Sequence, residues 1–130
     1  MEEPQSEFQV GNWVIYFREG NYCTIKSLQP ELILKGAIHD YTTTFEGIGK
    51  IKITEDKLQV IGFNIQHPKF IKKSNNKICV AVGFSPSGTY KLYKNDEPFC
   101  NVQFIHEVQN AYHKITGELL SGNLYGVREG

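Results

Sequence analysis

The sequence has no uninterrupted apolar run as long as the roughly 20 residues that a membrane-spanning helix needs, and no charged-then-apolar signal pattern opens it. It has only three cysteines (Cys23, Cys79 and Cys100), and no two of them form a CxxC pair. Such an odd, widely spaced set fits buried thiols in a reducing compartment better than a disulfide framework or a zinc site. We therefore expect a soluble, cytoplasmic protein without a membrane partner.

The familiar catalytic motifs are also missing: there is neither a GxSxG elbow nor a phosphate-binding P-loop. The segment from His106 to Asn110 departs from the zinc motif HExxH at its last position, where asparagine is a poor zinc ligand. His113 lies two helical turns from His106, too far to bind the same ion. We interpret these polar residues as the solvated side of a helix, with a ligand- or partner-binding face as the alternative. The sequence predicts no enzyme, no metal and no cofactor.

Acidic residues are absent from the middle of the chain. Fourteen basic and fourteen acidic residues cancel overall, but residues 57–95 hold seven lysines and no Asp or Glu. Clustered positive charge raises the local potential and attracts phosphates. The alternative is that these lysines lie on solvated strand faces and edges, where lysine prevents aggregation of the sheet. Arginine occurs only twice, as Arg18 and Arg128, both outside this segment. Because arginine is the usual reader of guanine edges, sequence-specific DNA binding is disfavoured.

Aromatic residues alternate with lysines in this acid-free segment. Period-two alternation places Tyr90 and Leu92 on one sheet face, with Lys91 and Tyr93 on the other. Rings beside ammonium groups suit a nucleotide, because the ring stacks on the base and the charge binds the phosphate. The alternative is that the rings build the core under the final helix. The residues predicted to contact such a ligand are Lys72, Lys73, Tyr90, Lys91, Tyr93 and Lys94.

The first half of the chain is strand-rich. With 130 residues and 40% hydrophobic content, the chain fits one domain or two small lobes sharing a core. Residues 8–17 and 22–28 alternate around a turn and predict a hairpin, residues 31–36 predict a third strand, and 42–45 and 50–53 favour extended backbone. We expect residues 1–7 to be a flexible lead-in and residues 8–53 to form an SH3-like small barrel.

The second half mixes helices with a meander. Thr54 is a predicted N-cap of a two-turn helix that ends at Gly62. Turns at 67–68, 74–76, 85–88 and 95–98 predict a three-stranded antiparallel meander. An apolar stripe of helical period then predicts a C-terminal helix closed by Gly117. Residues 54–120 are thus expected to form an α-β-β-β-α lobe and residues 121–130 a loose tail, which makes the fold class α+β.

Three segments carry a family resemblance. They are Val10-Gly11-Asn12-Trp13-Val14-Ile15-Tyr16, the run from Ile53 to Leu58 with Gly62-Phe63, and the run from Phe104 to Tyr112 with Thr116-Gly117-Glu118-Leu119. They resemble the opening strand, middle helix and closing helix of a family of small uncharacterised phage and prophage proteins. The family has no settled activity, so the resemblance assigns no residue a role. It implies a mobile genetic element in a bacterial host, where small proteins often bind or block host components.

Two hypotheses for function follow. The first is a non-enzymatic, phage-encoded anti-defence sponge that sequesters an anionic (cyclic) nucleotide signal in the host cytoplasm, through a homo-oligomer if the site crosses a protomer boundary. The second is an adaptor or inhibitor that binds a host protein, or nucleic acid without sequence preference. The adaptor hypothesis gives more weight to the rings of the N-terminal lobe, Trp13, Tyr16 and Tyr22.

Overall fold

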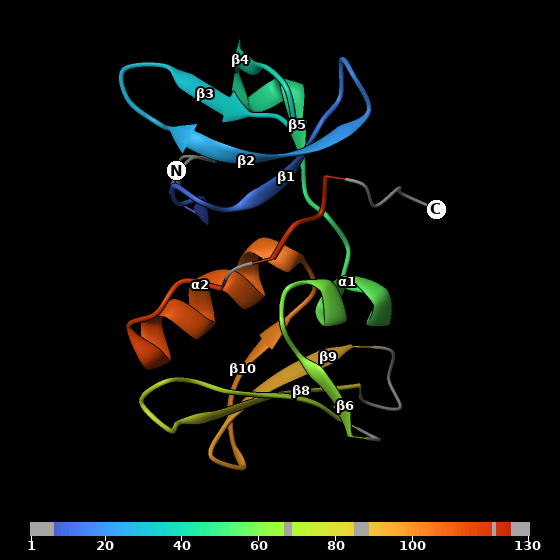
Figure 1. Ribbon diagram of the computed structural model, residues 1–130, viewed down its shortest axis with the longest axis vertical. Coiled ribbons are helices and arrows are strands. Elements are labelled where there is room, and N and C mark those ends of the chain that lie inside the picture. Colours follow the sequence, from blue (N-terminus) through green and yellow to red (C-terminus); the bar gives the residue numbers. More distant parts are fainter. Residues whose placement is uncertain (1–6, 67–68, 85–88, 121, 126–130) are drawn as a thin grey trace. The chain divides into compact units, whose positions relative to one another are not determined.

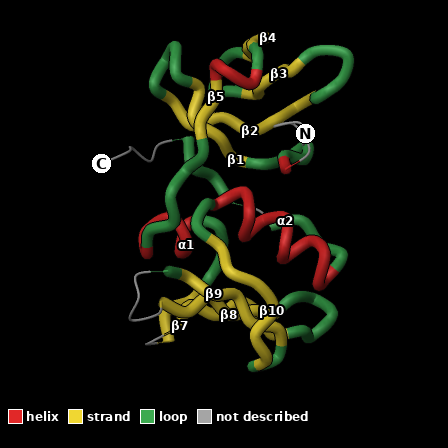
Figure 2. The backbone as a smooth tube through the Cα atoms, turned by 180° about the vertical axis from the view of Figure 1, so that it is seen from behind, coloured by secondary structure: helices red, strands yellow, loops and turns green. Residues whose placement is uncertain are grey.

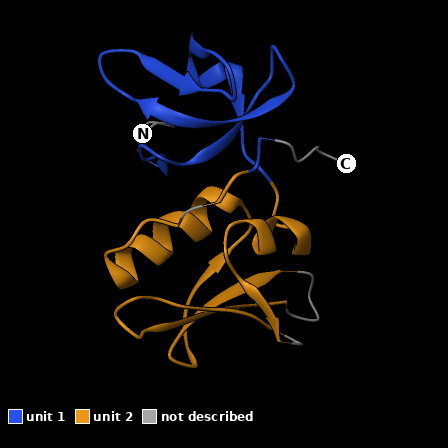
Figure 3. Cartoon of the chain, viewed as in Figure 1, with its two compact units in different colours: residues 1–51, 124–130 blue, residues 52–123 orange. Residues whose placement is uncertain are grey.

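The computed structural model describes residues 7–66, 69–84, 89–120 and 122–125. The chain divides into two compact units, shown in Figure 3. Unit 1 contains the chain up to Ile51 together with the segment from Leu124, and unit 2 contains Lys52–Asn123. Each unit holds one antiparallel five-stranded sheet, and the helices are few. The fold class is therefore α+β, as predicted. The predicted turns at 67–68 and 85–88, and most of the predicted lead-in, lie outside the described residues.

Unit 1 is a curled antiparallel sheet with the strand order β4-β3-β2-β1-β5 (Figure 1). Its elements are β1 (Trp13–Tyr16), β2 (Asn21–Ser27), β3 (Leu32–Lys35), β4 (Asp40–Thr43), the 3-10 helix η2 (Phe45–Gly47) and β5 (Ile48–Gly49). The predicted first hairpin is confirmed, with Val14 opposite Cys23 and Tyr16 opposite Asn21. Alternate residues enter a core made of Phe8, Val14, Tyr16, Cys23, Ile25, Leu32, Leu34 and Ile48.

The described strands of unit 1 do not close into a barrel. β4 and β5 are the two edges of the sheet and do not pair with each other. β5 is only two residues long, and it pairs with β1 at Ile15 and Tyr16. Residues 50–53, which the sequence predicted to be extended, do not form a strand of this sheet; Lys52 already belongs to unit 2, where it makes an isolated bridge to Phe104.

The C-terminal segment is partly packed rather than loose. Leu124 is fully buried, and the Tyr125 ring meets the Trp13 indole edge-on at 4.9 Å between centroids. The Tyr125 hydroxyl donates a hydrogen bond to the Lys35 carbonyl at 3.2 Å. These contacts attach the end of the chain to the first sheet. Residues 121 and 126–130 of the predicted tail lie outside the described residues.

Unit 2 is a five-stranded meander with two helices on the same side of the sheet (Figures 1 and 2). Its strands are β6 (Asn64–Gln66), β7 (Lys69–Lys73), β8 (Cys79–Phe84), β9 (Tyr90–Lys94) and β10 (Glu97–Val102), and its helices are α1 (Glu55–Val60) and α2 (Ile105–Thr116). The meander has five strands where three were predicted. β6 is a three-residue polar strand, and three of the five residues of β7 are lysines, so both sequences give a weaker strand signal than the apolar β8.

The predicted caps Thr54, at the start of α1, and Gly117, at the end of α2, are confirmed. The Lys57 amide donates to the Thr54 hydroxyl at 3.3 Å, which caps α1. At the start of α2, the Glu107 carboxylate accepts hydrogen bonds from the amides of Gln103 (2.8 Å) and Phe104 (3.1 Å). Gly117 ends α2 in the left-handed conformation, with φ of 76°. No helix within the described ranges is both long enough and apolar enough to span a bilayer.

Replacing Gly117 tests how far its backbone conformation contributes to stability. An added Cβ would meet nothing within 4 Å, so the effect of Gly117→Ala is conformational rather than steric crowding. We expect this variant to lower the free energy of unfolding by about 1 kcal/mol, because a residue with a Cβ disfavours positive φ. Urea denaturation followed by circular dichroism measures the change. Gly117→Asn is the matched control and should lose less, since asparagine tolerates this region; equal losses would contradict the explanation.

Candidate functional site

The two faces of the unit 2 sheet differ in what covers them. The register aligns Phe70 with Val82 and Val82 with Leu92, so these side chains share one face. All three are buried, and Figure 1 shows α1 and α2 on one side of this sheet. The helices therefore cover this apolar face, and neither helix covers the opposite face of the sheet.

The uncovered face, which we call the open face, is lysine-rich. One row of partners runs Lys69, Gly83, Lys91 and another runs Ile71, Ala81, Tyr93, while Lys73 stands opposite Cys79. None of the residues that the described register places on this face is acidic. Three lysines thus occupy one sheet surface without a neighbouring carboxylate on it, which is an electrostatic environment that attracts anions.

The predicted ligand contacts divide between the two faces. Lys91 and Tyr93 lie on the open face, as the alternation of β9 predicted, and Lys73 of β7 lies on the same face. The remaining three occupy the helix-covered side, where Lys72 and Lys94 flank the buried Val80 and Tyr90 stands between Phe84 and Val102. The structure therefore brings only half of the predicted set onto one surface.

The residues on the helix-covered side have partners there. The Lys72 ammonium lies 5.9 Å from the centroid of the Tyr112 ring of α2. Tyr90 packs edge-on against Phe84, with 5.1 Å between centroids. Burial raises the pKa of the Tyr90 phenol, and the carboxylate of Glu55 in α1 adds to the rise. These contacts place Lys72 and Tyr90 in the packing between sheet and helices.

On the open face, Tyr93 lies across Gly83 and against Lys69. A Cβ at position 83 would be 3.3 Å from Cε1 of Tyr93 and 3.6 Å from Cγ of Lys69, so both side chains pass over this glycine. The Lys69 ammonium is 4.3 Å from the centroid of the Tyr93 ring, a cation–π distance. Neither Lys69 nor Gly83 was among the predicted contacts. Register was the missing information, because β7 is separated from β9 by a whole strand.

Two sequence-based interpretations of polar and aromatic surfaces are wrong. His106 is only 1% exposed and its ring stacks on Phe104 at 6.1 Å, so it does not belong to the solvated side of α2. Trp13, Tyr16 and Tyr22, which the adaptor hypothesis placed at a surface, are all buried. Tyr16 belongs to the core of unit 1, whereas the register places Trp13 and Tyr22 on the opposite face of the β1–β2 hairpin, where they are buried as well. Burial of such large rings contributes strongly to stability.

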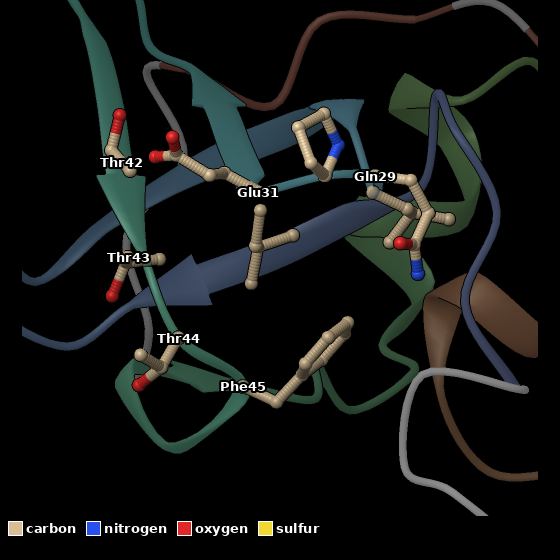
Figure 4. A pocket seen from close by; sticks show the side chains of 9 residues that line it. Gln29, Glu31, Thr42, Thr43, Thr44 and Phe45 are labelled. Atoms are coloured by element: carbon tan, nitrogen blue, oxygen red, sulfur yellow. The ribbon is translucent and has the colours of Figure 1, made fainter.

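Unit 1 has a pocket that the sequence did not indicate (Figure 4). It has a volume of about 670 Å³, within the range of small-molecule sites. Leu28, Leu32 and Phe45 supply apolar walls, and the loop from Gln29 to Glu31 and residues Thr42–Thr44 supply polar groups. The peptide bond between Gln29 and Pro30 is cis. The pocket lies between the loop after β2 and the end of β4. The sequence did not predict it, because these two segments are separated in the chain and local patterns do not show that they are neighbours.

Metal ligands and known relatives give no further assignment. Among the described residues, no group of three or more His, Cys, Asp or Glu side chains is placed to hold a metal ion. No protein-family model, curated protein or solved structure matches the chain. The open face of unit 2 therefore has to be interpreted from its own chemistry.

Thiol labelling tests the placement of the cysteines. Burial raises the pKa of Cys23 to about 11, and nearby Glu19 adds to the rise. At pH 8 only about 0.1% of this thiol is the reactive thiolate, and the fraction grows as the pH approaches 11. We expect iodoacetamide to modify the half-buried Cys79 of the open face first and Cys23 only upon unfolding, as peptide mass spectrometry would show. Labelling in urea is the control, because both thiols are then accessible. Equal labelling rates of Cys23 and Cys79 in the folded protein would contradict the burial of Cys23.

Proposed function

We propose that the protein is a non-enzymatic binding protein that sequesters an anionic nucleotide on the open face of unit 2. The observation that carries the proposal is the acid-free sheet face that Lys69, Lys73 and Lys91 share with Tyr93, whose ring Lys69 contacts. In its most specific form, the protein is a phage-encoded anti-defence sponge for a cyclic nucleotide signal in the host cytoplasm. The resemblance of three segments to phage and prophage proteins supports this more specific proposal.

Charge and aromaticity together favour a nucleotide over other anions. Lysine ammonium groups attract phosphate oxygens at any angle, because the charge is compact and the stem is flexible. An aromatic ring beside them adds a surface for a base, which a simple anion does not use. Lys73 is exposed, whereas Lys69, Lys91 and Tyr93 are partly exposed. These four side chains are therefore accessible to a ligand without unfolding of the sheet.

We also propose that unit 1 is a variant of the SH3-like small barrel. The support is topological: four strands in a meander are followed by a 3-10 helix and a short β5 that returns to β1. A homo-oligomer is proposed for the sponge as well, since a second copy would enclose a ligand that otherwise rests on an open sheet.

A second candidate function is an adaptor that binds single-stranded nucleic acid without sequence preference. Lys73 and Lys91 are four residues apart along the strands and two strands apart across the sheet. These steps correspond to roughly 13 Å along and about 10 Å across the sheet. One mononucleotide phosphate does not bind both lysines at these spacings, whereas a strand offers several phosphates. The spread of charge favours this candidate, and the lack of arginine on the face agrees with weak sequence preference.

A ligand screen distinguishes these functions. We expect the melting temperature to rise with a mononucleotide or cyclic dinucleotide, because a ligand that binds only the folded state stabilises it. Mass spectrometry of the compound released by denaturation should recover it intact. Recovery of a cleaved product would instead indicate an enzyme. A rise only with a thymidine decanucleotide would support the adaptor, and no rise with any nucleotide or strand would contradict both functions.

Charge removal on the two faces of β9 tests the location of the site. Lys91→Gln on the open face should weaken nucleotide binding about tenfold, the loss of one charged hydrogen bond. Lys94→Gln is the matched control, since Lys94 is exposed on the same strand but lies on the opposite face. Isothermal titration calorimetry measures both affinities. A larger loss for Lys94→Gln would move the site to the helix-covered side.

A further inference from the structure

The contact between Tyr93 and Lys69 has a feature that phosphate binding alone does not require. The two residues lie on strands separated by β8, and only the absence of a side chain at Gly83 allows the ring and the lysine stem to meet there. The Lys69 ammonium lies over one face of the Tyr93 ring, 4.3 Å from the centroid, and both side chains are partly exposed. A single flexible side chain therefore covers an aromatic face that is otherwise accessible from the open face.

Lysine is a weak cover for such a face. A cation–π contact at an exposed site changes an equilibrium by about two- to fivefold. Stacking of a base on an aromatic side chain changes affinity by roughly five- to 150-fold per base. A base therefore competes well for the ring, and the displaced ammonium keeps its charge close to the ligand. The same lysine that covers the ring in the free protein is then positioned to bind the phosphate attached to that base.

We propose that Tyr93 is the base-stacking residue of the open face and that Lys69 moves from the ring to the ligand phosphate when a nucleotide binds. This inference rests on the proposed nucleotide binding and specifies its ligand. The occupant is a free nucleotide, whose aromatic base and phosphate belong to one molecule. Lys91, which stands opposite Gly83 on the far side from Lys69, supplies the second positive charge. A polyanion without a base binds the lysines but gains nothing from the ring.

The test compares ligands with and without a base. The probes are adenosine monophosphate, cyclic di-adenosine monophosphate and inorganic tripolyphosphate, titrated by calorimetry into the full chain. We expect Tyr93→Leu to weaken nucleotide binding tenfold or more and to leave tripolyphosphate binding unchanged. Tyr93→Phe keeps the ring and should bind nucleotides within about twofold of the natural protein. Gly83→Ala, which crowds the ring, should weaken nucleotide binding as well.

The movement of Lys69 has its own readout. The Tyr93 ring current shifts the side-chain proton resonances of Lys69 upfield in the free protein, and Tyr93→Leu removes that shift. We expect a saturating nucleotide to remove it too, whereas tripolyphosphate should not uncover the ring. A nucleotide that binds while the Lys69 resonances keep their upfield shift would overturn the proposed movement.

The outcomes separate this inference from the function on which it rests. If no nucleotide binds the natural protein, the proposed function itself fails. If nucleotides bind but Tyr93→Leu weakens nucleotide and tripolyphosphate binding equally, the stacking role is overturned. The same holds if Tyr93→Leu changes the affinity for neither ligand. In both cases the proposed nucleotide binding remains. If only a thymidine decanucleotide binds, and Tyr93→Leu weakens it, the ring stacks on strand bases and the free nucleotide is overturned as the occupant.

Discussion

The structure of unit 2 depends on one constraint: an antiparallel sheet sends alternate side chains to opposite faces, and the helices cover only one of them. The covered face has to be apolar, and Phe70, Val82 and Leu92 meet that demand. The other face is free to carry charge, because its side chains bury little area. When a lysine-rich, acid-free segment forms such a sheet, some of its lysines therefore lie on the open face.

The chemistry of the open face is the basis of the proposed binding function. The open face has lysines with flexible stems on β7 and β9, the two strands that flank β8, and an aromatic ring, Tyr93, on β9. In the proposed function, the lysines bind the phosphate and the ring stacks on the base. The glycine at position 83 allows the Tyr93 ring and the Lys69 stem to approach each other over β8.

Unit 1 uses its aromatic residues differently. Its Trp13, Tyr16 and Tyr22 are buried, and Tyr16 packs on Tyr41 with 4.6 Å between ring centroids. A sheet of about 50 residues has few other ways to bury enough apolar area for stability. These three rings are therefore not available to a surface partner, whereas Phe17 of the same unit is 58% exposed. Unit 1 also has the pocket between the loop after β2 and the end of β4.

The sequence by itself determined the local elements and the faces of individual strands. The caps Thr54 and Gly117, and the opposite faces of Lys91 and Tyr90, follow from hydrogen-bonding chemistry and from the period of two, which depend on near neighbours only. Hairpin pairing between neighbouring strands was also predicted, but the tertiary structure alone decided the register across more than two strands and which face the helices cover. It therefore decided that Lys69 meets Tyr93 over Gly83, that Lys72 lies near Tyr112, and that His106 is buried. These outcomes depend on register and packing between residues far apart in the chain, and no local pattern encodes them.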